Sequence, residues 1–153
     1  MTKIEKYLYK CKRKLQYLGY GEWIEEPDEV IFPYKNTLCK ISRFIIEVEP
    51  SLGGMFGGHL CGYVKVPKNH LWYEKPYNEI ECFIHGGLTV SKQGTNTHYW
   101  VGFDCAHPGD LVPSLKKIFQ KMFANSVYRN IDYVMQECKN LVDQMENIEL
   151  KVK

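Results

Sequence analysis

Two short segments of the chain combine histidine and aspartate with glycine turns. One spans His85–Thr89 (HGGLT), and the other spans Gly102–Asp110 (GFDCAHPGD). Imidazoles transfer protons near neutral pH, carboxylates accept hydrogen bonds, and glycine turns expose N–H groups to a ligand. The two segments therefore predict a polar, ligand-binding cleft. Its expected ligand-binding residues are His85, Gly86, Gly87, Thr89, Trp100, Asp104, His107 and Asp110.

The residue types in this cleft suit either binding or catalysis. For binding, Trp100 would stack on a flat ring, the glycine N–H groups would take phosphate oxygens, and Asp104 and Asp110 would hold ribose hydroxyls. For catalysis, His85 and His107 would be general base and acid, with Asp104 or Asp110 beside them. A purely structural use is also open, because aspartates commonly cap turns and histidines can be hydrogen-bonded parts of a core.

Metal binding and nucleophilic catalysis have weaker signals. His85, Asp104, His107 and Asp110 are all potential metal ligands. The D-x-x-H-x-x-D spacing of the last three matches no strong metal motif, so we expect no metal and no cofactor. Alternation along the strand directs Cys105 into the core, where a thiol is inert. The sequence contains no P-loop, G-x-G-x-x-G, G-x-S-x-G or H-E-x-x-H motif.

Strands must position these residues, and alternating polarity predicts which way they face. Runs rich in β-formers predict five strands, at 30–34, 37–46, 59–66, 79–85 and 97–104. In the last strand Trp100 and Asp104 share the accessible face, while Val101 and Phe103 face the core. In the strand 79–85, His85 points away from the core side of Ile84. We therefore expect the candidate residues to line one concavity at the ends of the last two strands.

Helices and loops complete the predicted fold. Apolar periodicity predicts a helix at 3–18, a short helix capped by Ser114, and a long last helix from Ile131 to Met145 capped by Asn130. Pro33 marks the first strand as an edge strand. Residues 50–58 form a flexible glycine-rich loop, and 67–78 an aromatic loop. The expected fold is α+β, an antiparallel sheet of about five strands packed against an N-terminal helix and two C-terminal helices. The expected organisation is one domain over 1–153, with a basic helix at 1–18, the sheet at 30–104 and helices at 114–147.

Charge and cysteine usage narrow the classes of partner. The chain of 153 residues carries a net charge of +2. Its first 18 residues hold +5, which leaves −3 on the body, so we expect no duplex nucleic acid partner. The six cysteines form no C-x-x-C pair and no secretory signal precedes them, which predicts reduced thiols in a cytoplasm. No apolar run approaches the roughly 20 residues of a membrane span. The sequence does not decide between a monomer and a homo-oligomer.

Several motifs together resemble a family of small, bacteriophage-encoded proteins. They are HGGLT at 85–89, the segment WVGFDCAHPGD at 100–110, LCGYV at 60–64, NHLWY at 69–73 and YRN at 128–130. The resemblance covers about residues 59–145. Asn130 stands where the family more often has Asp, and the segment 111–127 is longer in this chain. The family carries mostly no assigned activity, so the resemblance implies a context in the cytoplasm of an infected bacterial cell.

That context leads to three hypotheses about function. The first is an anti-defence protein that binds and sequesters a nucleotide-derived immune messenger in the cleft. The second is a phosphodiesterase that cleaves such a messenger with His85 and His107 as the acid and base. The third is a protein–protein inhibitor of a host defence factor, acting through the basic helix 3–18 or the aromatic loop 67–78.

Overall fold

The structure is a computed structural model that describes residues 1–95 and 98–152. Five strands form one antiparallel sheet in the order β1-β2-β3-β5-β4. The strands are β1 (Glu29–Tyr34), β2 (Thr37–Glu47), β3 (Met55–Val66), β4 (Val90–Gln93) and β5 (Tyr99–Asp104). The helices are α1 (Lys3–Leu18), α2 (Pro113–Ile118) and α3 (Ile131–Val152), with single 3-10 turns at Glu22–Ile24, Pro50–Leu52 and Tyr77–Glu79. The predicted α+β class is therefore confirmed.

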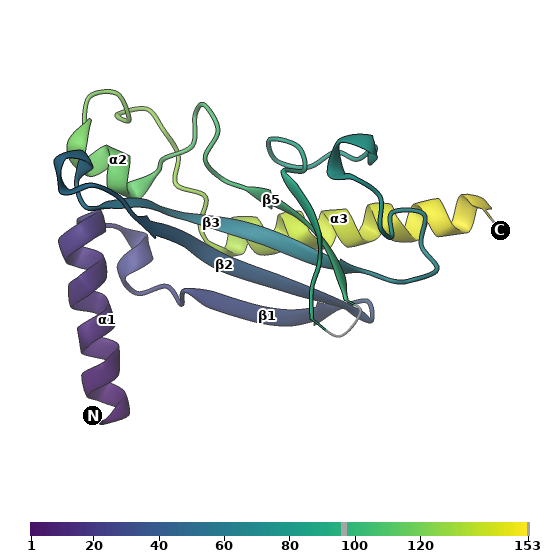
Figure 1. Cartoon of the computed structure of the whole chain (residues 1–153), viewed down its shortest axis with the longest axis horizontal. Coiled ribbons are helices and arrows are strands. Elements are labelled where there is room, and N and C mark those ends of the chain that lie inside the picture. The colour runs from purple at the N-terminus through teal and green to yellow at the C-terminus, as the bar shows by residue number, and fades with distance from the viewer. Residues whose placement is uncertain (96–97, 153) are drawn as a thin grey trace.

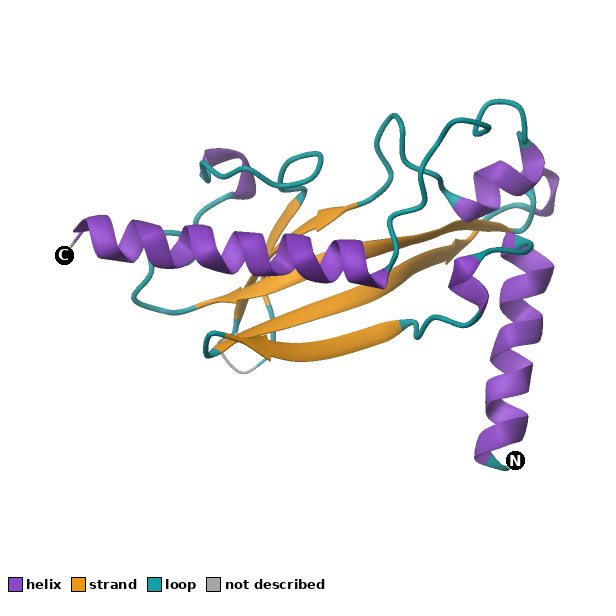
Figure 2. Ribbon diagram, turned by 180° about the vertical axis from the view of Figure 1, so that it is seen from behind, coloured by secondary structure: helices purple, strands orange, loops and turns teal. Residues whose placement is uncertain are grey.

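The long helix α3 covers one face of the sheet (Figure 2). Its apolar stripe recurs at helical spacing, and its most buried residues are Val134, Cys138, Leu141, Val142 and Met145. These side chains pack on sheet residues that alternate toward the same face, among them Ile41, Val64, Val101 and Phe103. The predicted core side of the last strand is thus correct. No described helix lies across the opposite face (Figure 1).

Asn130 caps α3 as predicted, because its side-chain oxygen accepts a hydrogen bond from the Tyr133 N–H at 3.0 Å. Ser114 does not cap α2. Pro113 occupies the first turn of that helix, and the Ser114 hydroxyl instead accepts a bond from the Gly57 N–H at 2.9 Å. α2 ends at Ile118, and Met122 beyond its end is exposed.

α1 projects away from one end of the sheet (Figure 1). Its expected apolar stripe is only partly used: Ile4 and Leu8 are 72% and 52% exposed, and Leu18 in the last turn is buried. Lys14 of the same helix is buried as well. Its ammonium donates to the backbone oxygens of Trp23 and Glu26 at 2.8 and 2.7 Å. Only the carboxyl end of the basic helix is therefore anchored in the body.

The predicted strand at 79–85 is wrong. A 3-10 turn ends at Glu79, and residues 80–84 belong to no strand; the sheet instead contains β4, at Val90–Gln93. The backbone of this segment is paired with a side chain instead of a strand. Gln144 of α3 accepts a hydrogen bond from the N–H of Phe83 and donates one to its carbonyl, each at 2.8 Å. The buried positions still alternate there, so polarity alone suggested a strand. The predicted start of the last strand at residue 97 lies outside the described residues.

The glycine-rich segment 50–58 is also more ordered than expected. Its first residues form a 3-10 turn, and β3 already begins at Met55. The pairing of β2 with β3 shifts register between Arg43 and Ile45, opposite Gly57. Gly57 has φ +118°, and a Cβ there would overlap the carbonyl of Phe44. Glycine thus permits a bulge that lengthens the strand.

Candidate functional site

Asp110 is the centre of the site, and it is almost completely buried, with 1% of its side chain exposed. Its Oδ2 lies 2.7 Å from Nε2 of His85 and accepts a bond from the His107 N–H at 3.0 Å. Its Oδ1 accepts a bond from Nε of Arg129 at 2.9 Å. Burial alone would raise the pKa of Asp110, but these hydrogen bonds outweigh it and lower the pKa below its usual value. Asp110 is therefore a carboxylate at neutral pH.

His85 is clamped between this carboxylate and the first turn of α3. Its Nδ1 lies 2.8 Å from the hydroxyl of Tyr133, so both ring nitrogens have partners. The Arg129 guanidinium stacks over the Tyr133 ring at 4.8 Å and so binds the same assembly from a second side. The beginning of α3, fixed by the Asn130 cap, thus sets the orientation of His85.

His107 lies beside this pair and also reaches the open side of the sheet. Its ring centroid is 5.7 Å from that of His85. Its Nδ1 is 3.7 Å from Asp104 Oδ1 and 3.6 Å from Asp110 Oδ2, which is too long for a hydrogen bond. The side chain is 27% exposed, yet this nitrogen is buried and has no hydrogen-bond partner. The backbone of Gly86 lies directly against the ring.

Asp104 ends β5 and faces the same region. Its Oδ1 accepts a bond from the Ala106 N–H at 3.1 Å, so the residue does shape the turn. It pairs in register with Cys61 of β3 and belongs to the sheet face opposite α3. Asp104 and His107 together stand between the buried pair and that open face.

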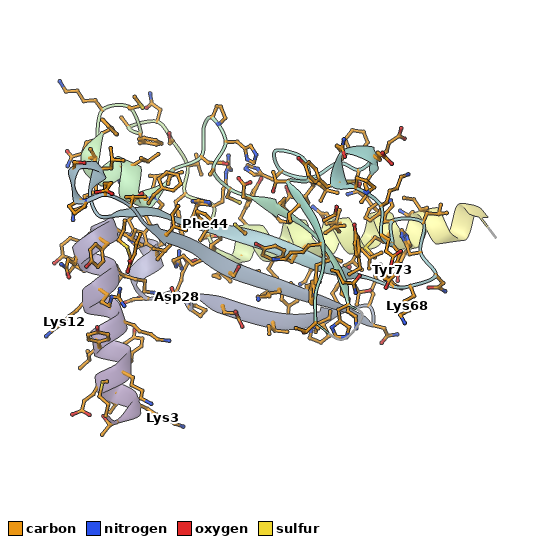
Figure 3. The ribbon with its side chains drawn as sticks, viewed as in Figure 1. Lys3, Lys12, Asp28, Phe44, Lys68 and Tyr73 are labelled. Carbon is orange, nitrogen blue, oxygen red and sulfur yellow. The ribbon has the colours of Figure 1, made fainter. Side chains whose placement is uncertain are left out.

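A cavity of about 540 Å³ opens on this face of the sheet. Aromatic rings from β2 and β3 form much of its wall. One of them is Phe44, which lies on the face of the sheet away from α3 (Figure 3). Its polar lining comes from β3, β5 and the following turns. The lining residues are Phe44, Phe56, His59, Cys61, Tyr63, Thr89, Val90, Phe103, Asp104, Ala106 and His107. None of these lining residues is a lysine or an arginine.

His59 is the second histidine of the cavity. It is buried beside the ring of Phe44, with ring centroids 5.2 Å apart. Burial lowers its pKa, because the charged imidazolium loses its hydration there. Its Nδ1 is buried without a hydrogen-bond partner. Among the described residues, the unpaired buried side-chain nitrogens and oxygens are Nδ1 of His59 and Nδ1 of His107, and both residues line this one cavity.

The structure brings together part of the predicted site. Thr89, Asp104 and His107 line the cavity, whereas His85 and Asp110 lie behind His107. Trp100 does not line it. That residue is near the other end of β5, in register with Lys65 and Lys92. The predicted residues therefore do not all line one concavity.

Two further expectations need correction. His85 does not face away from the core side, because it contacts Tyr133 of α3; the segment before it is no sheet strand and alternation does not fix its direction. Gly87 does not offer a free N–H group either, because that group donates to the carbonyl of Ile84 at 3.0 Å. Gly86 is instead the place where the backbone meets the His107 ring.

Sequence reasoning missed the aromatic wall and the residues that hold the buried pair. His59 and Tyr63 alternate with buried Leu60 along β3, and this period-2 pattern was the available signal for a second polar face. Tyr133 lies three residues after the cap Asn130, which gives no sign of a role in a site. Only the fold shows that it meets His85.

Comparisons with protein-family models, with curated proteins and with solved structures find no match for this chain. Within residues 1–95 and 98–152, no helix has the length and apolar character needed to cross a membrane. The function must therefore be argued from the site.

Proposed function

We propose that this protein binds a small, planar, polar molecule derived from a nucleotide in the cavity between Phe44 and His107. The pair of unpaired imidazole nitrogens, on His59 and His107, carries the proposal. A buried polar atom without a partner costs roughly 1–3 kcal/mol, and a bound ligand that hydrogen-bonds to it removes that cost. The cavity volume of about 540 Å³ lies within the usual range for small-molecule sites.

The wall of the cavity favours a flat ring as the buried part of the ligand. Phe44 and Phe56 stand edge to face at 6.4 Å, and Tyr63 lies on the same strand as Phe56. Aromatic faces stack on any base, whereas Asp104 and the two histidines supply acceptors and donors for its edge or for ribose hydroxyls. Phosphate groups would lie toward solvent, since the cavity has no lysine or arginine among its lining residues.

Sequestration fits this arrangement better than cleavage with His85 and His107 as acid and base. Both nitrogens of His85 are engaged, with Asp110 and Tyr133, so a proton transfer from His85 would first have to break one of those contacts. In the phage context implied by the resemblance, the ligand would be a messenger made by host immunity. The protein would lower its free concentration.

Binding can be tested by calorimetric titration with a panel of nucleotides and cyclic dinucleotides. Phe44→Ala should weaken the affinity by about 5- to 150-fold, because base stacking on an aromatic ring contributes about 1–3 kcal/mol. Trp100→Ala is the matched control, since Trp100 lies outside the cavity, and it should bind like the wild type. Absence of binding across the panel, or equal loss in both variants, would refute the proposal.

The release experiment separates sequestration from cleavage. The protein is incubated with the ligand that binds best and then denatured by heat, and the released molecule is examined by mass spectrometry. Sequestration predicts intact ligand in an amount equal to the protein. Release of broken product would instead support an enzyme in which His107, with Nδ1 near two carboxylates and its ring partly exposed, transfers the proton.

A further inference from the structure

The geometry points to a site for one divalent transition-metal ion of the zinc class, held by His85, His107 and Asp110. One donor atom from each of these residues lies within 4.8 Å of the other two. Asp104 adds a fourth donor atom, an oxygen 3.7 Å from Nδ1 of His107. The inference goes beyond the proposed nucleotide binding and does not depend on it. With an ion on Nδ1 of His107, the nucleotide would bond to Nδ1 of His59. It also differs from the expectation of no metal, because the D-x-x-H-x-x-D spacing matches no metal motif, whereas the fold brings His85 to His107 and Asp110.

The distances between donor atoms are close to those around a tetrahedral ion. Zinc bonds of about 2.1 Å place two ligand atoms roughly 3.4 Å apart. Nδ1 of His107 is 3.6 Å from Asp110 Oδ2 and 3.7 Å from Asp104 Oδ1, and Nε2 of His85 is 2.7 Å from the same Asp110 oxygen. Each of these three separations is within about 0.7 Å of the expected value. Small side-chain rotations would therefore suffice.

The unpaired Nδ1 of His107 is the second observation that favours an ion. This buried nitrogen faces two carboxylates but makes a hydrogen bond with neither. A cation would satisfy the nitrogen and both oxygens at once, which is why imidazole and carboxylate donors so often converge on a metal.

The surrounding contacts also resemble those that support metal ligands. Metal-bound histidines usually have a partner on the second ring nitrogen, and ligand carboxylates are usually hydrogen-bonded. Tyr133 supplies the first contact, to Nδ1 of His85, and Arg129 holds the Asp110 oxygen that is not shared with the histidines. These contacts leave Nε2 of His85 and Oδ2 of Asp110 as the atoms that face the proposed ion.

Binding requires a defined proton position on His85. Nε2 must offer its lone pair to the ion, so the ring proton must be on Nδ1, where it is donated to the Tyr133 oxygen. The Tyr133 hydroxyl proton can then be directed to Glu137, whose Oε1 lies 3.5 Å away. No net proton is lost in this change of tautomer. The bond between His85 and Asp110 is replaced by two bonds to the ion.

An ion at this place would border the cavity, because His107 and Asp104 belong to both. With Asp104 as the fourth protein ligand, the tetrahedral coordination of the ion would be complete. The ion would supply the positive charge that the lining residues lack. Zinc binding itself, however, requires only the protein.

The test is a titration of Zn²⁺ into chelator-treated protein, in competition with a coloured chelator and without nucleotide. We expect one equivalent to bind. His107→Ala should abolish this binding, whereas His98→Ala, which removes a histidine outside the cluster, should leave it unchanged. Tyr133→Phe should weaken it by about 10- to 100-fold, as for the loss of a supporting hydrogen bond. Circular dichroism confirms that each variant is folded.

Histidine NMR of the wild type tests the metal site without any variant, so its result holds even if a variant unfolds. The chain has five histidines, and Zn²⁺ should shift the ring nitrogens of His85 and His107 by direct coordination while those of His70 and His98 stay in place. Failure of the wild type to bind Zn²⁺, or equal binding by the wild type and His107→Ala, would overturn the metal site. Neither outcome affects nucleotide binding measured in the presence of a chelator, so the two proposals fail separately.

Discussion

Gly86→Ala should displace His107 and thereby disable the site without removing any polar side chain. A Cβ on Gly86 would lie 2.5 Å from Nε2 of His107 and closer still to two other ring atoms. Ordinary contact begins near 3.4 Å, so the ring would have to move by about 1 Å. Gly86 also has φ +67°, where an alanine costs roughly 1–2 kcal/mol. Overpacking adds about 1–3 kcal/mol, for a loss of roughly 2–5 kcal/mol.

Gly87→Ala is the matched control for this substitution. Gly87 has a similar φ of +82°, but an added Cβ there would meet nothing within 4 Å. It should lose only the backbone contribution of about 1–2 kcal/mol and keep ligand and metal binding. Urea unfolding gives the two free energies, and histidine NMR reports the position of His107. Equal stability losses with an unchanged His107 signal in both variants would show that the ring does not rest on Gly86.

Three further substitutions test other parts of the structure. His59→Phe should flatten the pH dependence of stability in mildly acidic solution. Because the pKa of His59 is lowered, wild-type stability is full above about pH 6.5 and falls by up to about 1.4 kcal/mol per pH unit as pH drops toward the folded pKa. Thermal unfolding that shows the same change in stability between pH 7 and pH 5 for both proteins would contradict the burial of His59 as a neutral ring. Asp110→Asn should cost about 3 kcal/mol at pH 7 and remove part of the acid sensitivity below about pH 4. The lowered pKa of the Asp110 carboxylate stabilises the fold above that range, and this stabilisation is lost as pH falls through the folded pKa. An unchanged acid titration by circular dichroism would argue against the pairing with Arg129. Ser114→Ala should cost about 1–3 kcal/mol in urea unfolding, since it leaves the Gly57 N–H buried without a partner, and a neutral result would mean that water replaces the hydroxyl.

Local patterns predicted the fold well where one physical signal dominated. The stripe of α3 has a clear helical period and a capping asparagine, and both were read correctly. The alternation of Val101 and Phe103 likewise identified the core side of β5. These signals depend on a single element facing one apolar layer, which a sequence expresses directly.

The predictions were wrong where contacts with side chains distant in the sequence determined the local structure. Residues 80–84 alternate in burial like a strand, but Gln144 takes the backbone groups of Phe83 that a neighbouring strand would otherwise pair. The direction of His85 followed that error. The partners of Asp110 come from three separate parts of the chain, and Arg129 was not predicted among them. Such long-range contacts leave no periodic signal.

The order of the strands also has a consequence for how the protein behaves at high concentration. The outer strands are β1 and β4, whose free edges could otherwise template pairing between molecules. Pro33 in β1 lacks an N–H group, and β4 has only four residues, with Lys92 exposed. Both edges are thus poor templates for intermolecular β-pairing. The two margins of the sheet therefore disfavour fibrous aggregation.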